Sequence, residues 1–185
     1  MNSDYKNLFG KFNGKEAEYA LRALDSETPK NKNFPWVQKF EEAFSEGIGS
    51  RYSIAVNSGT SGLHAALYAA GVSSGDEVIQ PATTVVMDAY VTMHLGAVPV
   101  FVDICPKSWN IDATKIEEKI TDKTKAIIVV SLYGLPVDID PILEIASKYN
   151  LIVVDDSAET LMTRYKEGMA GTHAHIGVFS FEKSK

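Results

Sequence analysis

The chain has 185 residues, of which 45% are hydrophobic and 23% charged, and 18 Lys and Arg against 24 Asp and Glu leave a net charge of −6. This length suits one domain or slightly more with a proper core, and the acidic balance argues against a nucleic-acid-binding surface. No apolar run is long enough to span a membrane, the single Cys105 excludes a disulfide framework or a cysteine-built metal cage, and the polar N-terminus lacks a signal peptide, so we expect a cytoplasmic protein.

Residues 1–50 form a polar region with two helical candidates. The pattern predicts helices over 15–24 and 36–46, separated by a turn-rich segment at 26–35. The pattern then changes, so we divide the chain into an N-terminal helical segment, 1–50, and a large domain, 51–185.

From residue 52 onward, short apolar runs alternate with helix-length amphipathic stretches. This alternation predicts an α/β fold in which helices cover both faces of a mostly parallel sheet. The predicted strands are 53–56, 77–80, 98–102, 126–130, 151–154 and 176–181, and the predicted helices are 61–70, 85–95, 113–120 and 139–149. In such sheets a ligand binds at the carboxyl ends of the strands, so the residues after each run are candidates for function.

The first such segment is 57–62, with the sequence Asn-Ser-Gly-Thr-Ser-Gly. Small residues let the backbone approach a ligand, and the following helix offers free N–H groups with a partial positive charge. The segment therefore predicts a phosphate cradle. It matches neither a GxGxxG turn nor a Walker loop, and a plain turn with a Ser or Thr N-cap is an equally good interpretation.

A second strand end carries Asp155 and Asp156 after the apolar run 151–154. A buried carboxylate stays ionised only beside a cationic partner, which can be a metal, an arginine or a protonated ring nitrogen. A metal is disfavoured because no third ligand stands at a usual spacing. A helix N-cap is the alternative role for either carboxylate.

The third segment is 180–185, with the sequence Ser-Phe-Glu-Lys-Ser-Lys. A lysine at this strand end could form a Schiff base, although lysines in such positions are ordinarily solvated. The three strand ends together supply a phosphate cradle, a carboxylate for a ring nitrogen and an amine for an aldehyde. This is the set of groups that pyridoxal phosphate requires.

Residues from about 12 to 185 resemble the N-terminal half of the DegT/DnrJ/EryC1/StrS aminotransferases, which act mainly on nucleotide-linked keto sugars. The segments that carry the resemblance are AVNSGTSGLHAAL, GDEVIQPATT, LGAVPVFVDI, ITDKTKAIIVVSLYG, VDIDPILEIA, LIVVDDSAE and GVFSFEKSK. The resemblance implies a three-layer, fold-type-I large domain with a mixed, mostly parallel sheet, in an obligate homodimer with shared active sites. It also implies a keto-sugar nucleotide and an amino-acid donor, L-glutamate, as substrates, with no nucleic-acid or membrane partner.

The resemblance also assigns roles by position. Gly59 and Thr60 match the backbone amides that bind the cofactor phosphate, and Ser180 matches the phosphate-binding serine. Asp156 matches the carboxylate at the ring nitrogen, and Lys185 matches the lysine that forms the imine, so these two residues are the catalytic candidates. Glu159 stands where many members have a glutamine beside the cofactor.

Some positions depart from the family pattern. Val85 replaces the aromatic residue that stacks on the cofactor ring in many members, which leaves that partner open. The family's members are longer, so we expect that this sequence is either a fragment or a sequence cut at a modified Lys185. We favour the second interpretation. Two alternatives to the aminotransferase remain: a sugar 3-dehydratase of the same superfamily, in which histidine replaces the lysine, and a non-catalytic interaction module.

Overall fold

The computed structural model describes residues 15–26 and 35–182. They fall into two compact units. One holds the described residues up to Gly47 together with Arg51–Ala55, and the other holds Ile48–Ser50 and the described residues from Val56 onward. No helix in these described ranges is long and apolar enough to cross a membrane.

The first unit contains the helices α2 (Lys15–Ser26) and α3 (Pro35–Ile48), which confirms the two helices predicted there. Aromatic rings provide contacts between and within them. Tyr19 and Trp36 meet edge to face with ring centroids 5.8 Å apart, and Phe40 stacks on Phe44 one turn along α3 at the same separation.

Residues 53–56 form no strand, so that prediction is wrong. Ile54 is 83% exposed, and these residues pair with none of the strands in the described ranges. The Ala55 N–H donates instead to Glu41 Oε1 at 2.8 Å. An alternating apolar pattern makes a strand only where a sheet edge is present to pair with it. The segment 57–62 therefore follows a stretch that lies outside the sheet.

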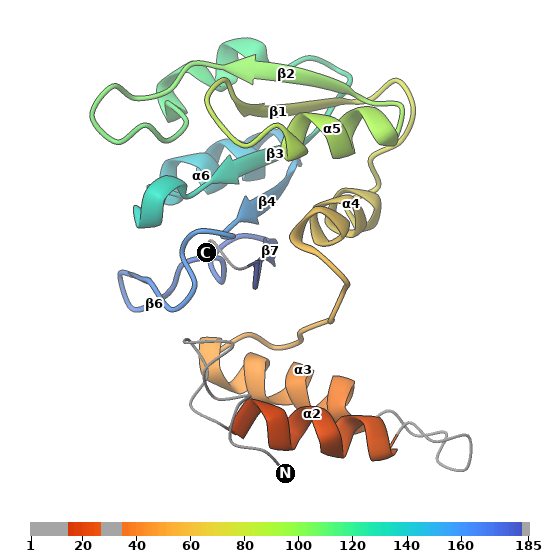
Figure 1. Ribbon diagram of the computed structural model, residues 1–185. Coiled ribbons are helices and arrows are strands. Elements are labelled where there is room, and N and C mark those ends of the chain that lie inside the picture. The colour runs from red at the N-terminus through yellow and green to blue at the C-terminus, as the bar shows by residue number, and fades with distance from the viewer. Residues whose placement is uncertain (1–14, 27–34, 183–185) are drawn as a thin grey trace. The chain divides into compact units, whose positions relative to one another are not determined.

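The second unit is built on a five-stranded sheet. Its strands are β1 (Glu77–Pro81), β2 (Val98–Val102), β3 (Thr124–Val130), β4 (Ile152–Asp156) and β7 (Ile176–Val178). Their order is β2-β1-β3-β4-β7 and every neighbouring pair is parallel (Figure 1). The predicted parallel sheet is confirmed, although β7 is shorter than the predicted run 176–181. The strand order reverses between β1 and β3, which places the ligand crevice of such folds at their carboxyl ends.

Helices cover both faces of this sheet, which confirms the three-layer α/β fold (Figure 1). The helices α4 (Gly59–Ala69) and α5 (Met87–His94) cover what we call the α4–α5 face, and α6 (Asp140–Tyr149) covers the α6 face. Alternate residues of one strand point to opposite faces, so Val154 joins the buried cluster of α4 and α5 while its neighbour Val153 joins that of α6.

Two short regions differ from the prediction. Residues 113–120 form two 3₁₀ turns, η1 (Ala113–Lys115) and η2 (Glu117–Lys119), rather than one α-helix. The Asp112 side chain accepts the Thr114 N–H and caps the first turn, and Ile116, between the two turns, is fully buried. The antiparallel pair β5 (Arg164–Tyr165) and β6 (Gly168–Met169) was not predicted, because two-residue strands carry no detectable period.

Candidate functional site

The N-terminus of α4 presents unpaired backbone donors. Ser58 caps the helix: its Oγ accepts the Ser61 N–H at 3.1 Å, and its carbonyl accepts the Gly62 N–H at 3.0 Å. The N–H groups of Gly59 and Thr60 find no acceptor among the described residues. Two free donors at the positive end of a helix form a site for an anion.

Ser180 lies against this helix end. A Cβ added to Gly59 would lie 3.2 Å from the Ser180 Cβ and 3.4 Å from its Oγ, which is closer than side chains ordinarily approach. The glycine therefore allows the backbone of α4 to pass beside the Ser180 hydroxyl. Two segments far apart in the sequence thus combine backbone N–H groups and a hydroxyl in one anion cradle.

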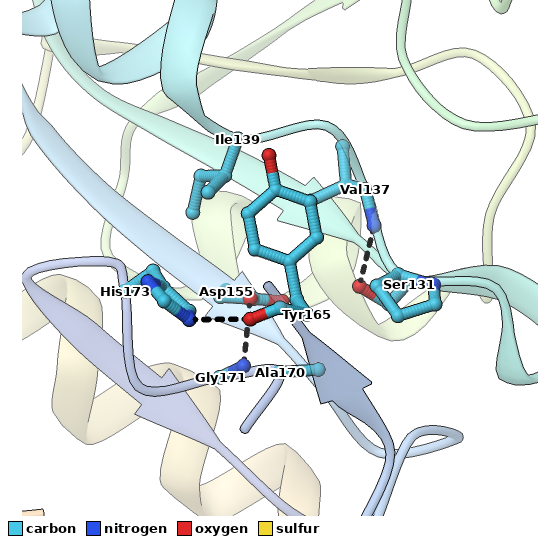
Figure 2. A pocket seen from close by; sticks show the side chains of 9 residues that line it. Ser131, Val137, Ile139, Asp155, Tyr165, Ala170, Gly171 and His173 are labelled. Carbon is cyan, nitrogen blue, oxygen red and sulfur yellow. Dashed lines mark hydrogen bonds between the residues drawn. The ribbon is translucent and has the colours of Figure 1, made fainter. Parts of the chain in front are cut away.

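Strand β4 ends in two carboxyl groups that point to opposite faces of the sheet. Asp155 points to the α6 face, where its Oδ1 accepts the Ser157 hydroxyl at 3.0 Å and its Oδ2 accepts the Gly171 N–H at 3.1 Å. Figure 2 shows it in a small cavity with Tyr165 and His173. Burial raises the pKa of Asp155 to about 6. Its oxygens are engaged by the protein, so its role is to hold the loop that contains Gly171.

Asp156 points to the α4–α5 face. It is only 5% exposed, and its Oδ1 accepts the Ala158 N–H at 3.0 Å. Val154 and Val178, which lie on this same face, pack with Leu63 of α4 in one buried cluster. The structure thus places Asp156 on the side of the sheet that also carries the cradle of Gly59, Thr60 and Ser180, as the sequence-based assignment requires.

A second acid, which the sequence analysis missed, lies beside Asp156. Asp88 on α5 is fully buried, and its Oδ2 accepts the Thr84 hydroxyl at 2.5 Å. Its pKa is raised to about 7, first by burial and then by the negative charge of Asp156. The sequence signal that could have pointed to Asp88 is a single acid in a short helix whose other residues are largely uncharged and whose neighbouring elements are apolar.

Glu159 joins the ends of two strands. Its Oε2 accepts the Tyr133 N–H at 2.7 Å, just after β3. Tyr133 has a φ of 53°, in the left-handed region that bulky residues seldom adopt, and this hydrogen bond helps to hold it there. The predicted cofactor contact of Glu159 stays a prediction, as does the role of Lys185, which lies outside the described residues.

The described groups fit a ligand that carries a phosphate and a cationic ring nitrogen. The free N–H groups of Gly59 and Thr60 suit the anion, and the buried Asp156 suits the cation. Both groups lie on one face of the sheet at the carboxyl ends of its strands.

Comparison with known proteins gives a consistent result. The model of the DegT/DnrJ/EryC1/StrS aminotransferase family matches residues 12–185. GDP-perosamine synthase of Escherichia coli O157:H7 is 43% identical over 172 residues, which make up 93% of this chain and 47% of that protein. UDP-2-acetamido-2-deoxy-3-oxo-D-glucuronate aminotransferase of Pseudomonas aeruginosa is 41% identical over 151 residues, or 82% of this chain and 42% of the relative.

Solved structures agree with the sequence relatives. The structure of an aminotransferase from Psychrobacter cryohalolentis superposes with a TM-score of 0.85 and 37% identity, over 92% of this chain and 43% of that one. The chain thus spans about half the length of the curated relatives that it matches.

Proposed function

The chain belongs to the DegT/DnrJ/EryC1/StrS aminotransferase family, and on this premise we propose that it is a pyridoxal-phosphate-dependent aminotransferase. We propose that it converts a nucleotide-linked keto sugar to an amino sugar and takes the amino group from an amino acid, L-glutamate. The observation that carries this proposal is the free donor pair of Gly59 and Thr60 on the same sheet face as the buried Asp156.

The described residues account for binding of the cofactor at its two ends. The Gly59 and Thr60 N–H groups and the Ser180 hydroxyl donate to the phosphate, where the helix end adds a favourable dipole. The Asp156 carboxylate accepts from the ring nitrogen and keeps it protonated. When bound, pyridoxal phosphate supplies a ring that takes up the electrons left on carbon after a proton is removed.

Lys185 and Glu159 complete the proposed site. The Lys185 amine would hold the cofactor at its aldehyde, and it would serve as the general base that moves a proton at the amino-acid carbon. Glu159 orients the loop after β3 through the Tyr133 N–H and thereby shapes the cofactor's surroundings.

The names of the relatives support the proposed substrate. One relative is by name a GDP-perosamine synthase and another acts on a UDP-linked 3-oxo sugar, which supports a nucleotide-linked keto sugar as acceptor. We propose a cytoplasmic homodimer with shared active sites as the working form, to be checked by sedimentation of the full-length protein.

Absorption spectroscopy tests the proposed reaction directly. We expect the purified full-length protein to show the visible band of a lysine-bound cofactor, and L-glutamate to convert this band to that of the amine form. Lys185→Ala removes the band, whereas Lys123→Ala, a change at a surface loop, leaves it intact. A cofactor that is already in the amine form and indifferent to glutamate would indicate the dehydratase. No band after addition of pyridoxal phosphate would overturn the enzyme assignment in favour of a non-catalytic module.

A further inference from the structure

Asp88 has a buried oxygen that no neutral donor satisfies. Its Oδ2 accepts the Thr84 hydroxyl, but its Oδ1 is buried and accepts no hydrogen bond within the described part of the chain. The Gln80 Nε2 atom is likewise without an acceptor there, so it does not serve Oδ1 either. An ionised carboxylate in this position would leave a desolvated negative oxygen uncompensated, which is among the costliest arrangements in a protein interior.

The neighbour of Asp88 is a second acid. The negative charge of Asp156 raises the pKa of Asp88, and two neighbouring carboxyl groups can form a hydrogen bond with each other only when one of them carries a proton. Asp156 accepts the Ala158 N–H, which favours its charged form. The Thr84 hydroxyl occupies Oδ2 of Asp88, so Oδ1 is the atom of Asp88 left to carry the proton.

We propose that Asp88 is a positioning residue of the cofactor site, which keeps a proton on Oδ1 and donates it to Asp156. The pair then carries a single negative charge where the cofactor's ring nitrogen binds. This inference rests on the proposed function, because it assigns a task to Asp88 only if Asp156 faces that nitrogen.

Other titratable groups on the packed elements do not replace Asp156 in this role. Helix α4 carries His64, β1 carries Glu77, which accepts the Thr121 hydroxyl at 2.6 Å, and β2 has no titratable side chain. Asp155 on β4 points to the α6 face, and the rings of Tyr90 and His94 of α5 contact each other at a tilt, with centroids 4.4 Å apart. Among the charged groups, Asp156 alone is identified as shifting the pKa of Asp88.

A metal site is not the better explanation of the acid pair. Two carboxyl groups provide too few ligands for a dedicated cation site, and the described residues contain no group of three or more His, Cys, Asp or Glu side chains placed to hold a metal. A shared proton satisfies both carboxyl groups with the atoms that the chain itself supplies.

The shared proton has a consequence for the reaction. One negative charge balances one protonated ring nitrogen, whereas two charges would raise the proton affinity of that nitrogen further and change the light absorption of the bound cofactor. Asp88 therefore sets the charge of the pair, and loss of its proton as the pH rises would be visible in the cofactor spectrum.

The experiment compares the full-length wild type with Asp88→Asn, whose amide can still donate to Asp156 but cannot ionise. We expect the wild-type cofactor spectrum to change with pH as Asp88 loses its proton, and Asp88→Asn to bind cofactor while losing this titration. Thr84→Val removes a hydrogen bond that lowers the pKa of Asp88, so its midpoint should move to higher pH. Asp155→Asn is the matched control, and it should keep the wild-type midpoint.

Infrared spectroscopy of the cofactor-free protein gives a readout that does not depend on activity. Near pH 7, where Asp155 has largely lost its proton, a protonated carboxyl band should be present in the wild type and absent in Asp88→Asn. An unchanged band, or an unchanged spectral titration in both Asp88→Asn and Thr84→Val, overturns the proposal. If the infrared band behaves as expected but neither the wild type nor any variant binds cofactor, the shared proton is confirmed. The proposed function is then wrong, and so is the role of Asp88 in the cofactor site.

Discussion

Asp155 and Asp156 are adjacent residues of the same type at the end of one strand, and both are buried. They differ in what faces them. Asp155 meets neutral donors, the Ser157 hydroxyl and the Gly171 N–H, on the α6 face. Asp156 meets another acid, Asp88, on the α4–α5 face. The difference teaches that strand alternation directs two adjacent carboxyl groups to opposite faces, one toward the loop that it holds and the other toward the proposed cofactor site.

Two glycines show a similar contrast, since one packs against fixed backbone and the other packs mainly against a side chain of the proposed site. A Cβ on Gly177 would lie 1.9 Å from the Gly171 carbonyl oxygen. Because this oxygen belongs to the backbone and cannot move away, Gly177 is needed for β7 to pack against the neighbouring loop. A Cβ on Gly59 would lie closest to the Ser180 side chain, at 3.2 Å from its Cβ, and at an ordinary contact distance of 3.7 Å from the Phe179 carbonyl oxygen. The first glycine is required by the fold, whereas the second is required by the cradle.

The comparison predicts its largest effect on activity at Asp156. Asp156→Asn should lower kcat/KM by about 10²- to 10³-fold, because the charge that faces the developing ring charge is lost, while the midpoint of denaturant unfolding changes little. Asp155→Asn, one residue earlier, should keep most of the activity. Equal losses in the two variants would show that the assignment of the faces is wrong.

The largest effect on stability is predicted at Asp155. Asp155→Ala leaves the Gly171 N–H and the Ser157 hydroxyl buried without an acceptor, at about 1–3 kcal/mol for each group, so unfolding in urea should occur at markedly lower concentration. The control is Asp112→Ala, which removes an exposed carboxyl that accepts the Thr114 N–H at 3.0 Å and should cost about 1 kcal/mol. A smaller loss at Asp155 than at Asp112 would contradict the structural role.

Most of the sheet could be predicted from the sequence because its strands are short runs rich in apolar residues. The runs 77–80, 98–102 and 126–130 are largely apolar, and they match β1, β2 and β3 to within two residues. The run 53–56 looks equally apolar, yet Ile54 is exposed and the run is not a strand. Pattern alone therefore cannot say whether a partner strand is present.

The site was predictable only in part, for a related reason. Gly59, Thr60, Ser180 and Asp156 belong to recognisable segments after apolar runs, and the structure places them on one face. Asp88 was missed, because an acid in an eight-residue helix ordinarily faces solvent, and only tertiary packing shows that this one is fully buried. Thr84 was missed with it, since its role depends on Asp88.

Both buried acids predict a dependence of stability on pH. The folded-state pKa of Asp155, about 6, lies above its ordinary value of 3.8, so the native state binds more protons than the unfolded state between these values. Stability from this group is therefore complete below about pH 4 and is lost as the pH rises to about 6, by at most about 1.4 kcal/mol per pH unit. The stability that Asp88 contributes is likewise lost as the pH rises, up to about pH 7.

Urea unfolding measured at a series of pH values checks this dependence. Asp155→Asn should flatten the curve between about pH 4 and pH 6, and Asp88→Asn should flatten it up to about pH 7. The exposed Asp112, whose pKa is lowered mainly by a hydrogen bond from Thr114, acts in the opposite direction, but solvent screening keeps its contribution small. A stability that rises between pH 4 and pH 6 in the wild type, and equally in both variants, would contradict the prediction.

The smallest predicted effect tests the cradle through its glycine. Gly59→Ala should weaken cofactor binding about tenfold, because the new Cβ displaces the Ser180 hydroxyl from a hydrogen bond to a charged phosphate. Ser180→Gly deletes the Ser180 Cβ and Oγ, the closest atoms that the new methyl group would meet. If Gly59→Ala acts through Ser180, the double variant should bind cofactor no more weakly than Ser180→Gly alone, since neighbouring changes that act on one group are not additive. Additive losses in cofactor titrations would instead show that Gly59 is needed for the conformation of the helix end itself, and the cradle would then belong with Gly177 among the requirements of the fold.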